Sequence, residues 1–386
     1  MRDGELRPEA SRIADIEVLR AISVLMVLVQ HTPFNLVFWN NHFFNQVLAS
    51  MGLWTGVDIF FAISGFVIAR SLMPEIGVRN GLEFIERVIK FWIRRVWRLW
   101  PSAWLWLIVP IFLCLLYNRS GVFGSLQGNW EGFIAGILNL ANFRMAQLYG
   151  GPHPVGVAFV QWSLSLEEQF YFILPLAVFV FRRWLPAPLL LIAGMEFVLY
   201  PTPLVMSLRL GPVALGVLLA IWSRTPSYQL CEPRGLASNR LARTLTLAIP
   251  LVCLVSLGTD WMHIVWFRNG PIEVMAVFLV WIGSYNRDYL WSEGTSRRLL
   301  EWIASRSYSL YLVHISFYFG MHETWFRLMG AAQPPRKFVA ITYVLIGWAM
   351  VFLAADLNHR FVERPLRQRG KKIAAHFGIE KIAALA

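Results

Sequence analysis

The sequence predicts an all-α polytopic membrane protein with about ten transmembrane helices and both termini in the cytoplasm. Of its 386 residues, 57% are hydrophobic and 15% are charged, whereas soluble proteins carry about 25% charged residues. Apolar runs close to the roughly 20 residues that a transmembrane helix needs recur along the chain. The expected spans lie near residues 16–38, 50–70, 99–117, 161–181, 187–203, 205–222, 244–261, 270–285, 307–326 and 338–357.

The distribution of Lys and Arg indicates how many apolar runs cross the membrane. An eleventh run, at 132–143, is short and carries two Asn, so it could be a re-entrant helix, a surface helix or a real span. If it does not cross, 27 of the 35 Lys and Arg residues fall on the cytoplasmic side and six fall outside. If it crossed, every later loop would change sides and this asymmetry would largely vanish. Because cytoplasmic loops are enriched in Lys and Arg, we predict ten spans.

The same distribution sets the expected organisation and excludes other classes of protein. We expect a cytoplasmic N-terminal segment (1–15), a membrane domain (16–368) and a basic cytoplasmic tail (369–386). The net charge of +12 would suit nucleic-acid binding, but the basic residues form a collar that faces the inner membrane surface and its lipids. The three cysteines are odd in number and show no metal-binding spacing. We therefore expect neither a nucleic-acid partner nor a metal.

The first two expected spans carry ionisable residues at bilayer depth, where such residues are costly and mark functional sites. In "LRAISVLMVLVQH", Arg20 and His31 are eleven residues apart, about 16 Å and three helical turns, so they lie on nearly the same face. Arg20 could instead snorkel to the headgroups or pair with Glu17. His31 could accept a substrate proton or be a satisfied buried histidine. Asp58 is surrounded by apolar residues and needs a partner, for which His31 is at a similar depth.

A cluster of arginines follows on the cytoplasmic side, in "FWIRRVWRLWP". Arg94, Arg95 and Arg98 could be ordinary positive-inside anchors within a belt of tryptophans. They could also form a platform for an anionic cofactor, because guanidinium groups match phosphates. Pro101 would then begin the third span.

Two later segments supply further candidates. In "QWSLSLEEQFY", Ser163 or Ser165 could cap a helix, while Ser163 and Glu167 share one helical face with Phe170 or Tyr171. In the span at 307–326, His314 could be a second catalytic histidine or a hydrogen-bonded packing residue. Candidate substrate-binding residues are Trp162, Ser163, Tyr171 and His314.

Taken together, these motifs resemble the acyltransferase-3 family of integral-membrane O-acyltransferases, and the resemblance covers about residues 15 to 368. Five landmarks carry it, followed by a sixth at the end: "LRAISVLMVLVQH", "GVDIFFAISGF", "RRVWRLWP", "WSLSLEEQFY", "SYSLYLVH" and "VERPLR". Each motif alone is weak, and their order is what makes the resemblance specific.

The resemblance implies a ten-helix enzyme of the bacterial inner membrane. Such an enzyme takes an acyl group, acetyl by default, from a cytoplasmic acyl-CoA and passes it to a hydroxyl of a surface, exported or lipid-linked glycan. His31 would be the essential histidine with Arg20 as its partner. Arg95 and Arg98 match the family's R-x-x-R and would face the CoA phosphates, while Glu167 matches the acid of its "WSL-x-x-E" motif. Some relatives append an SGNH-type esterase domain; here a separate extracytoplasmic partner would supply any step that needs one, unless none is needed.

The residues fit a direct mechanism. His31 would act as general base on the sugar hydroxyl, Asp58 would steady the imidazole, and Arg20 would stabilise developing charge or hold the cofactor. A covalent acyl-histidine is an alternative route. A proton-coupled carrier, or a polysaccharide translocator of similar fold without acyl chemistry, remains a competing hypothesis. The sequence shows no internal repeat and no paired broken helices, which many carriers have.

Overall fold

The computed structural model describes residues 13–39, 50–72, 81–150, 156–259, 261–262, 265–330 and 336–378. The outer parts of the expected N-terminal segment and tail therefore lie outside the described residues. Within these ranges the chain is helical, and an isolated bridge between Pro33 and Val37 is its one strand-like pairing.

Helices occupy all ten expected spans. The main ones are α1 (Ala14–Asn35), α3 (Gly56–Leu72), α4 (Gly81–Leu116), α5 (Leu126–Ile137), α6 (Ala141–Gly150), α7 (Gln161–Phe181), α8 (Pro186–Met195), α10 (Gly211–Trp222), α12 (Arg240–Leu257), α13 (Asn269–Ser284), α14 (Thr295–Ser305), α15 (Ser307–Met329), α16 (Lys337–Asn358) and α17 (Arg364–Ala375). Short α9 (Pro203–Ser207) and α11 (Pro226–Leu230) lie between them. The expected boundary between membrane domain and tail, at 368/369, falls inside α17.

Five of the helical segments in the described residues are long and apolar enough to cross a membrane. They are Leu53–Leu72, Gly81–Leu116, Val157–Trp184, Arg240–Leu257 and Phe338–Ala375. Three further apolar helices, α8, α10 and α13, have only 10, 12 and 16 residues. These segments define a multi-pass membrane protein, while ten crossings and cytoplasmic termini remain predictions.

Helix α4 is longer than the sequence predicts. The expected cytoplasmic stretch up to residue 98 runs without a break into the expected span, which gives one helix of 36 residues. At 1.5 Å per residue it is about 54 Å long, well beyond the roughly 30 Å of a bilayer core. Pro101 was expected to begin a span and instead lies inside α4. The arginines that precede it are thus fixed on the same rigid element as the membrane-spanning part.

The eleventh apolar run is broken into two short helices. Helix α5 ends at Ile137 and α6 begins at Ala141, with Asn139 between them at a φ of 56°. Their 12 and 10 residues correspond to about 18 and 15 Å, shorter than a bilayer core. This break supports the prediction that residues 132–143 do not cross.

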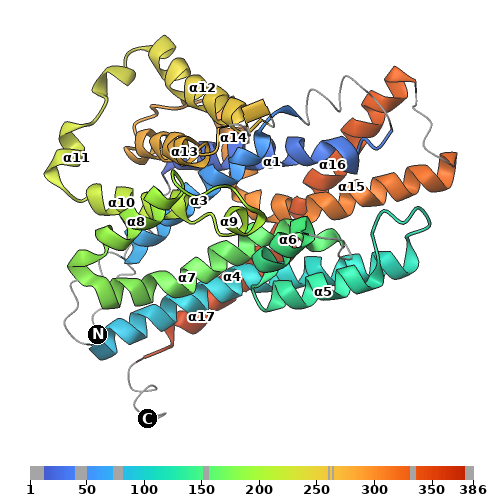
Figure 1. Ribbon diagram of the computed structural model, residues 1–386, viewed down its shortest axis with the longest axis horizontal. Helices are drawn as coiled ribbons and strands as arrows, with labels where there is room; N and C mark the ends of the chain where they lie inside the picture. Colours follow the sequence, from blue (N-terminus) through green and yellow to red (C-terminus); the bar gives the residue numbers. More distant parts are fainter. Residues whose placement is uncertain are drawn as a thin grey trace, which may run out of the picture.

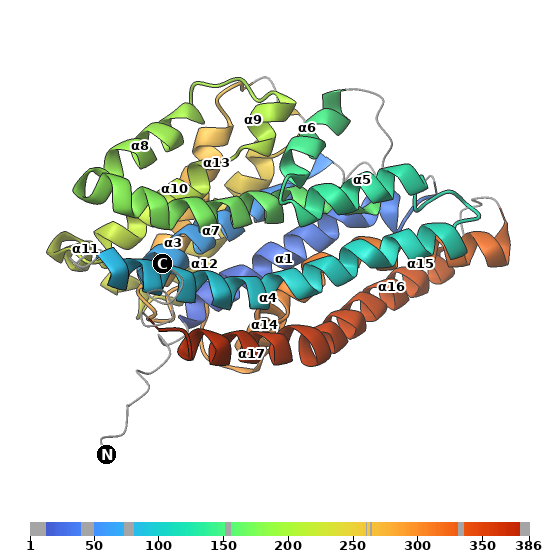
Figure 2. The ribbon, with the colours of Figure 1, turned by 90° about the horizontal axis from the view of Figure 1, so that it is seen from below.

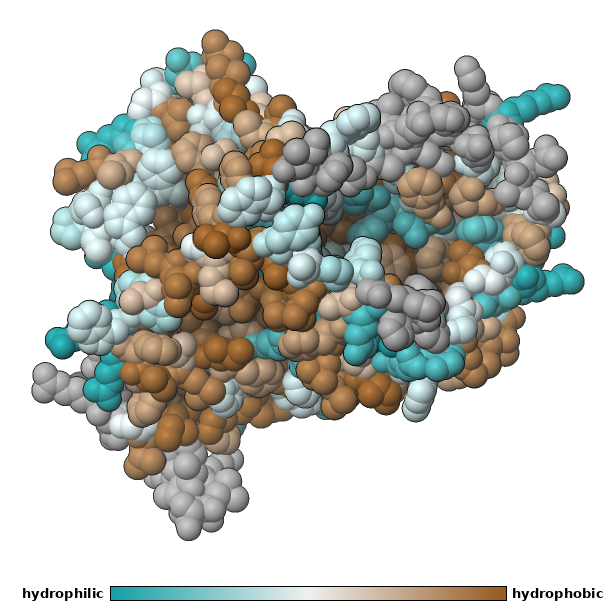
Figure 3. Space-filling model, viewed as in Figure 1, coloured by the Kyte–Doolittle hydropathy of each residue, from teal (hydrophilic) through white to brown (hydrophobic). Residues whose placement is uncertain are grey.

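The helices gather around α1, which packs against α3, α13, α14 and α15 (Figure 1). Helices α16 and α17 run along one edge of the bundle, where α17 packs against α4 and α16 against α15 (Figure 2). Hydrophobic side chains spread across the middle of one face (Figure 3). Phe112 and Leu116 at the end of α4 are 57% and 77% exposed. Exposed apolar side chains of this size favour aggregation in water, whereas they are expected on a surface that faces lipid.

Helices α3 and α10 approach closely through glycines. A Cβ atom on Gly65 would lie 2.1 Å from the carbonyl oxygen of Val213, and one on Gly216 would lie 2.3 Å from that of Ala62. Small residues at such contacts let helix backbones pack in a membrane. Gly65 and Gly216 are therefore packing residues.

We expect Gly65→Ala to destabilise the protein by about 1–3 kcal/mol, because the added methyl group forces α3 and α10 apart. The midpoint of thermal unfolding in detergent measures this effect. Gly320→Ala on α15 is the matched control, since a Cβ there meets no atom within 4 Å. Equal unfolding midpoints for the two variants would contradict the close contact.

Candidate functional site

A pocket of about 80 Å³ lies where α1, α3, α4, α7 and α15 meet, and we call it the cationic pocket. Its charged and polar lining includes Arg20, Arg95, Arg98, Ser64, Glu167 and Tyr171. Arg95 and Arg98 are three residues apart on α4, which puts both on the side that faces the pocket.

Glu167 organises the polar side of the cationic pocket. Its Oε1 accepts hydrogen bonds from the hydroxyl groups of Ser64 and Tyr171. The Arg95 guanidinium lies 4.9 Å above the centre of the Tyr171 ring. Ser163, Glu167 and Tyr171 all line this pocket, as their shared helical face predicts.

The arginines give the pocket a positive charge. Arg95 lies within electrostatic reach of Arg20, Arg98 and Glu167. Arg20 forms an ion pair of 2.6 Å with Glu17, as one sequence-based alternative had it, and still lines the pocket. Three guanidinium groups facing one lining carboxylate favour an anionic ligand, and phosphates match their geometry.

Arg94 does not take part in the cationic pocket. It is exposed on α4 and is absent from the pocket's lining. One residue turns a helix by about 100°, so Arg94 and Arg95 point to different sides. The expectation that all three arginines hold a cofactor is wrong for Arg94.

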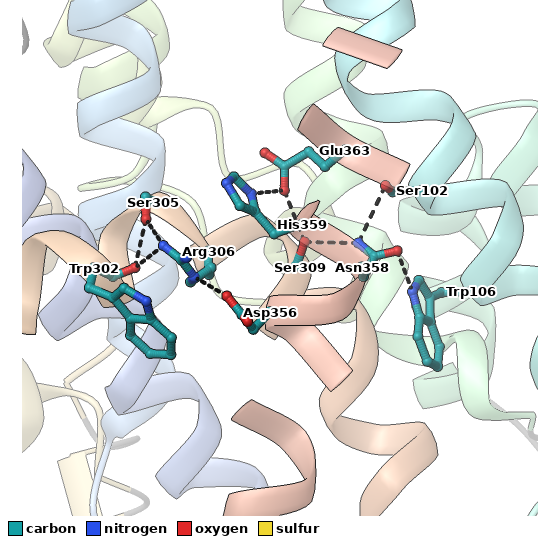
Figure 4. A network of polar contacts seen from close by, with 10 residues as sticks. All are labelled: Ser102, Trp106, Trp302, Ser305, Arg306, Ser309, Asp356, Asn358, His359 and Glu363. Atoms are coloured by element: carbon teal, nitrogen blue, oxygen red, sulfur yellow. Dashed lines mark hydrogen bonds and ion pairs between the residues drawn. The ribbon is translucent and has the colours of Figure 1, made fainter. Parts of the chain in front are cut away.

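A polar network lies around the end of α16 (Figure 4). Glu363 is 3% exposed and lies in a π-helical turn, His359–Glu363. Its Oε2 accepts a hydrogen bond from Ser309 at 2.9 Å and contacts His359 Nδ1 at 3.1 Å. Glu363 also lies within electrostatic reach of Arg98. The network therefore joins α15 to the end of α16.

A second, larger pocket, of about 510 Å³, contains His31, and we call it the histidine pocket. Aliphatic and aromatic side chains make up most of its lining, and one cation, Arg268, joins them. The aromatic residues are Trp54, Tyr149, Phe159, Trp162 and Tyr311. Aromatic faces of this kind present a large apolar surface with polar edges, which suits a ligand that is apolar on one face and polar at its rim.

His31 is hydrogen-bonded to His314 across α1 and α15. His31 Nδ1 and His314 Nε2 are 3.1 Å apart, and His314 Nδ1 is 2.7 Å from the carbonyl oxygen of Tyr311. A carbonyl oxygen only accepts, so His314 Nδ1 carries the proton and neutral His314 accepts at Nε2. His31 must then donate from Nδ1, which leaves the lone pair of His31 Nε2 free to accept a proton.

The structure corrects two sequence-based expectations about this histidine. Asp58 was expected to steady His31, but Asp58 Oδ1 lies 2.8 Å from Arg209 Nη2, with both side chains buried. His314 was expected to bind substrate, but it is 0% exposed and lies behind His31. Depth in the membrane was the only basis for pairing Asp58 with His31, and it does not fix the direction in which a side chain points.

Arg20 is not placed to act as a direct partner of His31. Arg20 lines the cationic pocket and His31 lines the histidine pocket. Their eleven-residue separation corresponds to about 16 Å along α1. The two pockets share the side chains of Val57 and Tyr311, so Arg20 and His31 lie on opposite sides of a common wall.

Sequence-based reasoning missed most residues of the histidine pocket, among them Trp54 and Tyr311. Trp54 forms part of its wall, and its backbone N–H donates to Gln30 Oε1 at 3.1 Å. The Arg209 guanidinium lies 4.8 Å above the Trp54 ring, so the buried Asp58–Arg209 pair supports this wall from behind. Tyr311 was noted only as a neighbour of His314. Local patterns hold no signal for these contacts, which join distant parts of the chain.

One local expectation at α7 is also wrong. Neither Ser163 nor Ser165 caps the helix, which begins after Val160 without a side-chain cap. The Ser163 hydroxyl lies 2.7 Å from that of Tyr311.

Among the described residues, no group of three or more His, Cys, Asp or Glu side chains could hold a metal ion.

The fold and the paired pockets define a multi-pass membrane protein with an internal polar site. The chain belongs to the acyltransferase-3 family, because the model of its acyltransferase domain matches residues 13–356. The sequence-based resemblance is thereby confirmed.

Curated relatives of known name match along the same length. YrhL of Bacillus subtilis (strain 168), whose name assigns it provisionally to peptidoglycan O-acetylation, is 26% identical over 93% of this chain and 55% of its own. The peptidoglycan O-acetyltransferase OatA of Listeria monocytogenes is 25% identical over 93% of this chain and 56% of its own. The O-acetyltransferase OatA of Staphylococcus aureus (strain NCTC 8325 / PS 47) is 24% identical over 93% and 58%. This chain therefore spans about half the length of these relatives. No solved structure matches it.

Proposed function

We propose that this protein is an O-acetyltransferase that moves an acetyl group from a cytoplasmic acyl-CoA to a hydroxyl of a cell-surface or exported glycan in a bacterial inner membrane. The observation that carries the proposal is the placement of His31, whose Nε2 is free to accept a proton one wall away from three arginines. The names of the relatives favour peptidoglycan as the glycan.

The cationic pocket is the proposed site of the donor. The phosphates of acyl-CoA would bind Arg95, Arg98 and Arg20, which are the charges that match them. The pantetheine arm would then run toward the shared wall and carry the thioester to the side of His31. Arg20 would hold the donor, which is one of the two roles its sequence position suggested.

The histidine pocket is the proposed site of the acceptor. Trp54, Trp162 and Tyr149 offer flat apolar faces on which sugar rings stack, and the pocket's volume suits a saccharide rather than a single small ion. Trp162, which was predicted to bind substrate, lines this pocket, while Ser163 and Tyr171 line the cationic pocket.

The proposed chemistry is a direct transfer. His31 Nε2 takes the proton of the sugar hydroxyl while the oxygen attacks the thioester carbonyl carbon. The carbon–sulfur bond breaks, and the departing thiolate receives the proton from His31. The products are the acetyl ester and CoA, and His314 holds the imidazole in the required tautomer throughout.

A label-transfer experiment tests the proposal. Membranes that contain the protein are incubated with acetyl-CoA labelled in the acetyl group and with the host's own glycans. We expect label to enter the glycan as an alkali-labile ester, with release of free CoA, and membranes without the protein to give neither. Folded protein that binds glycan but never transfers label would contradict the proposal and favour a carrier.

His314 should influence the rate without touching substrate. His314→Ala removes the acceptor that holds the proton of His31 on Nδ1, so we expect kcat to fall about tenfold to hundredfold, the worth of a hydrogen bond to a charged group. The KM for acetyl-CoA should not change, since His314 lies outside the cationic pocket. His314→Gln offers an amide oxygen to His31 and should restore part of the rate. No recovery by Gln, together with a changed KM, would contradict the positioning role.

A further inference from the structure

The wall between the two pockets consists of Val57 on α3 and Tyr311 on α15, the two side chains that line both. We propose that Val57 and Tyr311 form a filter that admits only a small, uncharged acyl group to His31. This inference rests on the proposed function, and it assigns to these two residues the choice of the transferred group.

The side chains that the proposed reaction needs lie on the two sides of this wall. Of these two pockets, the cationic pocket is lined by Arg95 and Arg98, and the histidine pocket is lined by His31. A donor anchored by its phosphates on the arginine side can react only if its thioester carbon reaches the other side. The acyl group is the leading end of an acyl-CoA, so it meets Val57 and Tyr311 before any other part of the donor does.

Tyr311 is held firmly in the wall. Its hydroxyl donates to the carbonyl oxygen of Val160 at 2.8 Å and lies 2.7 Å from the hydroxyl of Ser163, which can donate to it in turn. Val160 lines the histidine pocket and Ser163 the cationic pocket, so the two bonds fix the ring between both. The backbone carbonyl of Tyr311 also accepts from His314. A ring that swung aside would break both hydrogen bonds of its hydroxyl group.

Val57 is equally constrained. It lies in the first turn of α3 and is 9% exposed. The preceding Gly56 is so close to α1 that a Cβ on it would lie 2.7 Å from the carbonyl oxygen of Ser23. A β-branched side chain also has little freedom about χ1. The helix start cannot retreat toward α1, and the side chain cannot rotate freely to make room.

The chemistry of the wall sets the kind of group that passes. Val57 and the Tyr311 ring are apolar, and the Tyr311 hydroxyl is already bonded. A succinyl carboxylate at this point would lose its hydration without gaining a partner, which is costly. The arginines would instead retain that carboxylate on their own side. Longer alkyl chains would need more room than the closely packed Val57 and Tyr311 side chains leave between them.

Competition among acyl donors tests the filter. Membranes with the wild-type protein, Val57→Ala or Val57→Ile are given labelled acetyl-, propionyl-, butyryl- or succinyl-CoA, and the rate of transfer to glycan is measured for each. For the wild type we expect acetyl to exceed butyryl by at least about tenfold, since one or two methylenes change pocket discrimination by that order. Val57→Ala should raise the butyryl-to-acetyl ratio about tenfold, and Val57→Ile should lower the propionyl-to-acetyl ratio.

A matched control separates the wall from a general loosening of α3. Val67→Ala removes the same atoms ten residues further along α3, outside the lining of both pockets, and should leave every ratio unchanged. Equal ratios for Val57→Ala, Val57→Ile and Val67→Ala would overturn the filter, as would equal use of acetyl- and butyryl-CoA by the wild type. In both cases acetyl transfer by the wild type would leave the proposed function standing.

Discussion

Replacement of His31 by alanine is expected to lower acetyl transfer by about 10²–10⁴-fold, the usual contribution of a positioned general base. His31 is the partly exposed member of the histidine pair, and its free Nε2 faces a pocket large enough for an acceptor. Binding of acyl-CoA should not change, because the residues that face the donor phosphates lie in the other pocket. Initial rates of label transfer, normalised to the amount of folded protein, measure the loss.

His322→Ala is the control for this substitution. His322 also lies on α15, but its ring stacks on Phe38 with the ring centres 3.7 Å apart, away from both pockets. It should retain most of the activity. Equal transfer by His31→Ala and the wild type would show that His31 is not the general base and that its tautomer does not affect the reaction.

The double substitution Arg95→Ala and Arg98→Ala is expected to raise the KM for acetyl-CoA by at least about a hundredfold. Hydrogen bonds to charged groups are each worth about 1.5–3 kcal/mol, and the double variant removes two of the three guanidinium groups of the cationic pocket. At saturating donor, kcat should change much less, since these residues do not reach the bond that breaks. Transfer rates at increasing concentrations of acetyl-CoA separate the two quantities.

Arg94→Ala provides a matched control within the same motif. It removes one positive charge from the same helix, but Arg94 is exposed outside the pocket. Its KM should stay within about twofold of the wild type, as for a surface charge of little energetic weight. An equal rise in KM for Arg94→Ala would mean that the arginines attract acetyl-CoA through the overall positive charge of the protein's cytoplasmic surface and not through the cationic pocket.

The sequence predicted the positions of the helices better than their lengths. Helix α7 occupies residues 161–181, as its apolar run predicts. Helices α8 and α10 are much shorter than the runs around them, because glycines and prolines near their ends allow turns that hydropathy does not register. Helix α4 is longer, because arginines and tryptophans are good enough helix formers to continue it beyond the apolar part.

The site was predictable where its residues share one helix and unpredictable where they do not. The face formed by Ser163, Glu167 and Tyr171 follows from helical spacing, and so does the pairing of Arg95 with Arg98. The partners of His31 and Asp58 lie on α15 and beside α10, far away in the sequence. Hydropathy and spacing place such residues at a depth, but only packing decides which of them meet.

The hydrogen-bond chain that starts at His31 ends at a backbone carbonyl. His314 Nδ1–H donates its hydrogen bond to the carbonyl oxygen of Tyr311, which accepts but has no proton of its own to pass on. A proton taken up by His31 therefore has no exit through His314. The histidine pair can therefore hold a proton during one reaction without conducting it across the membrane. A site of this kind would not dissipate a transmembrane proton gradient.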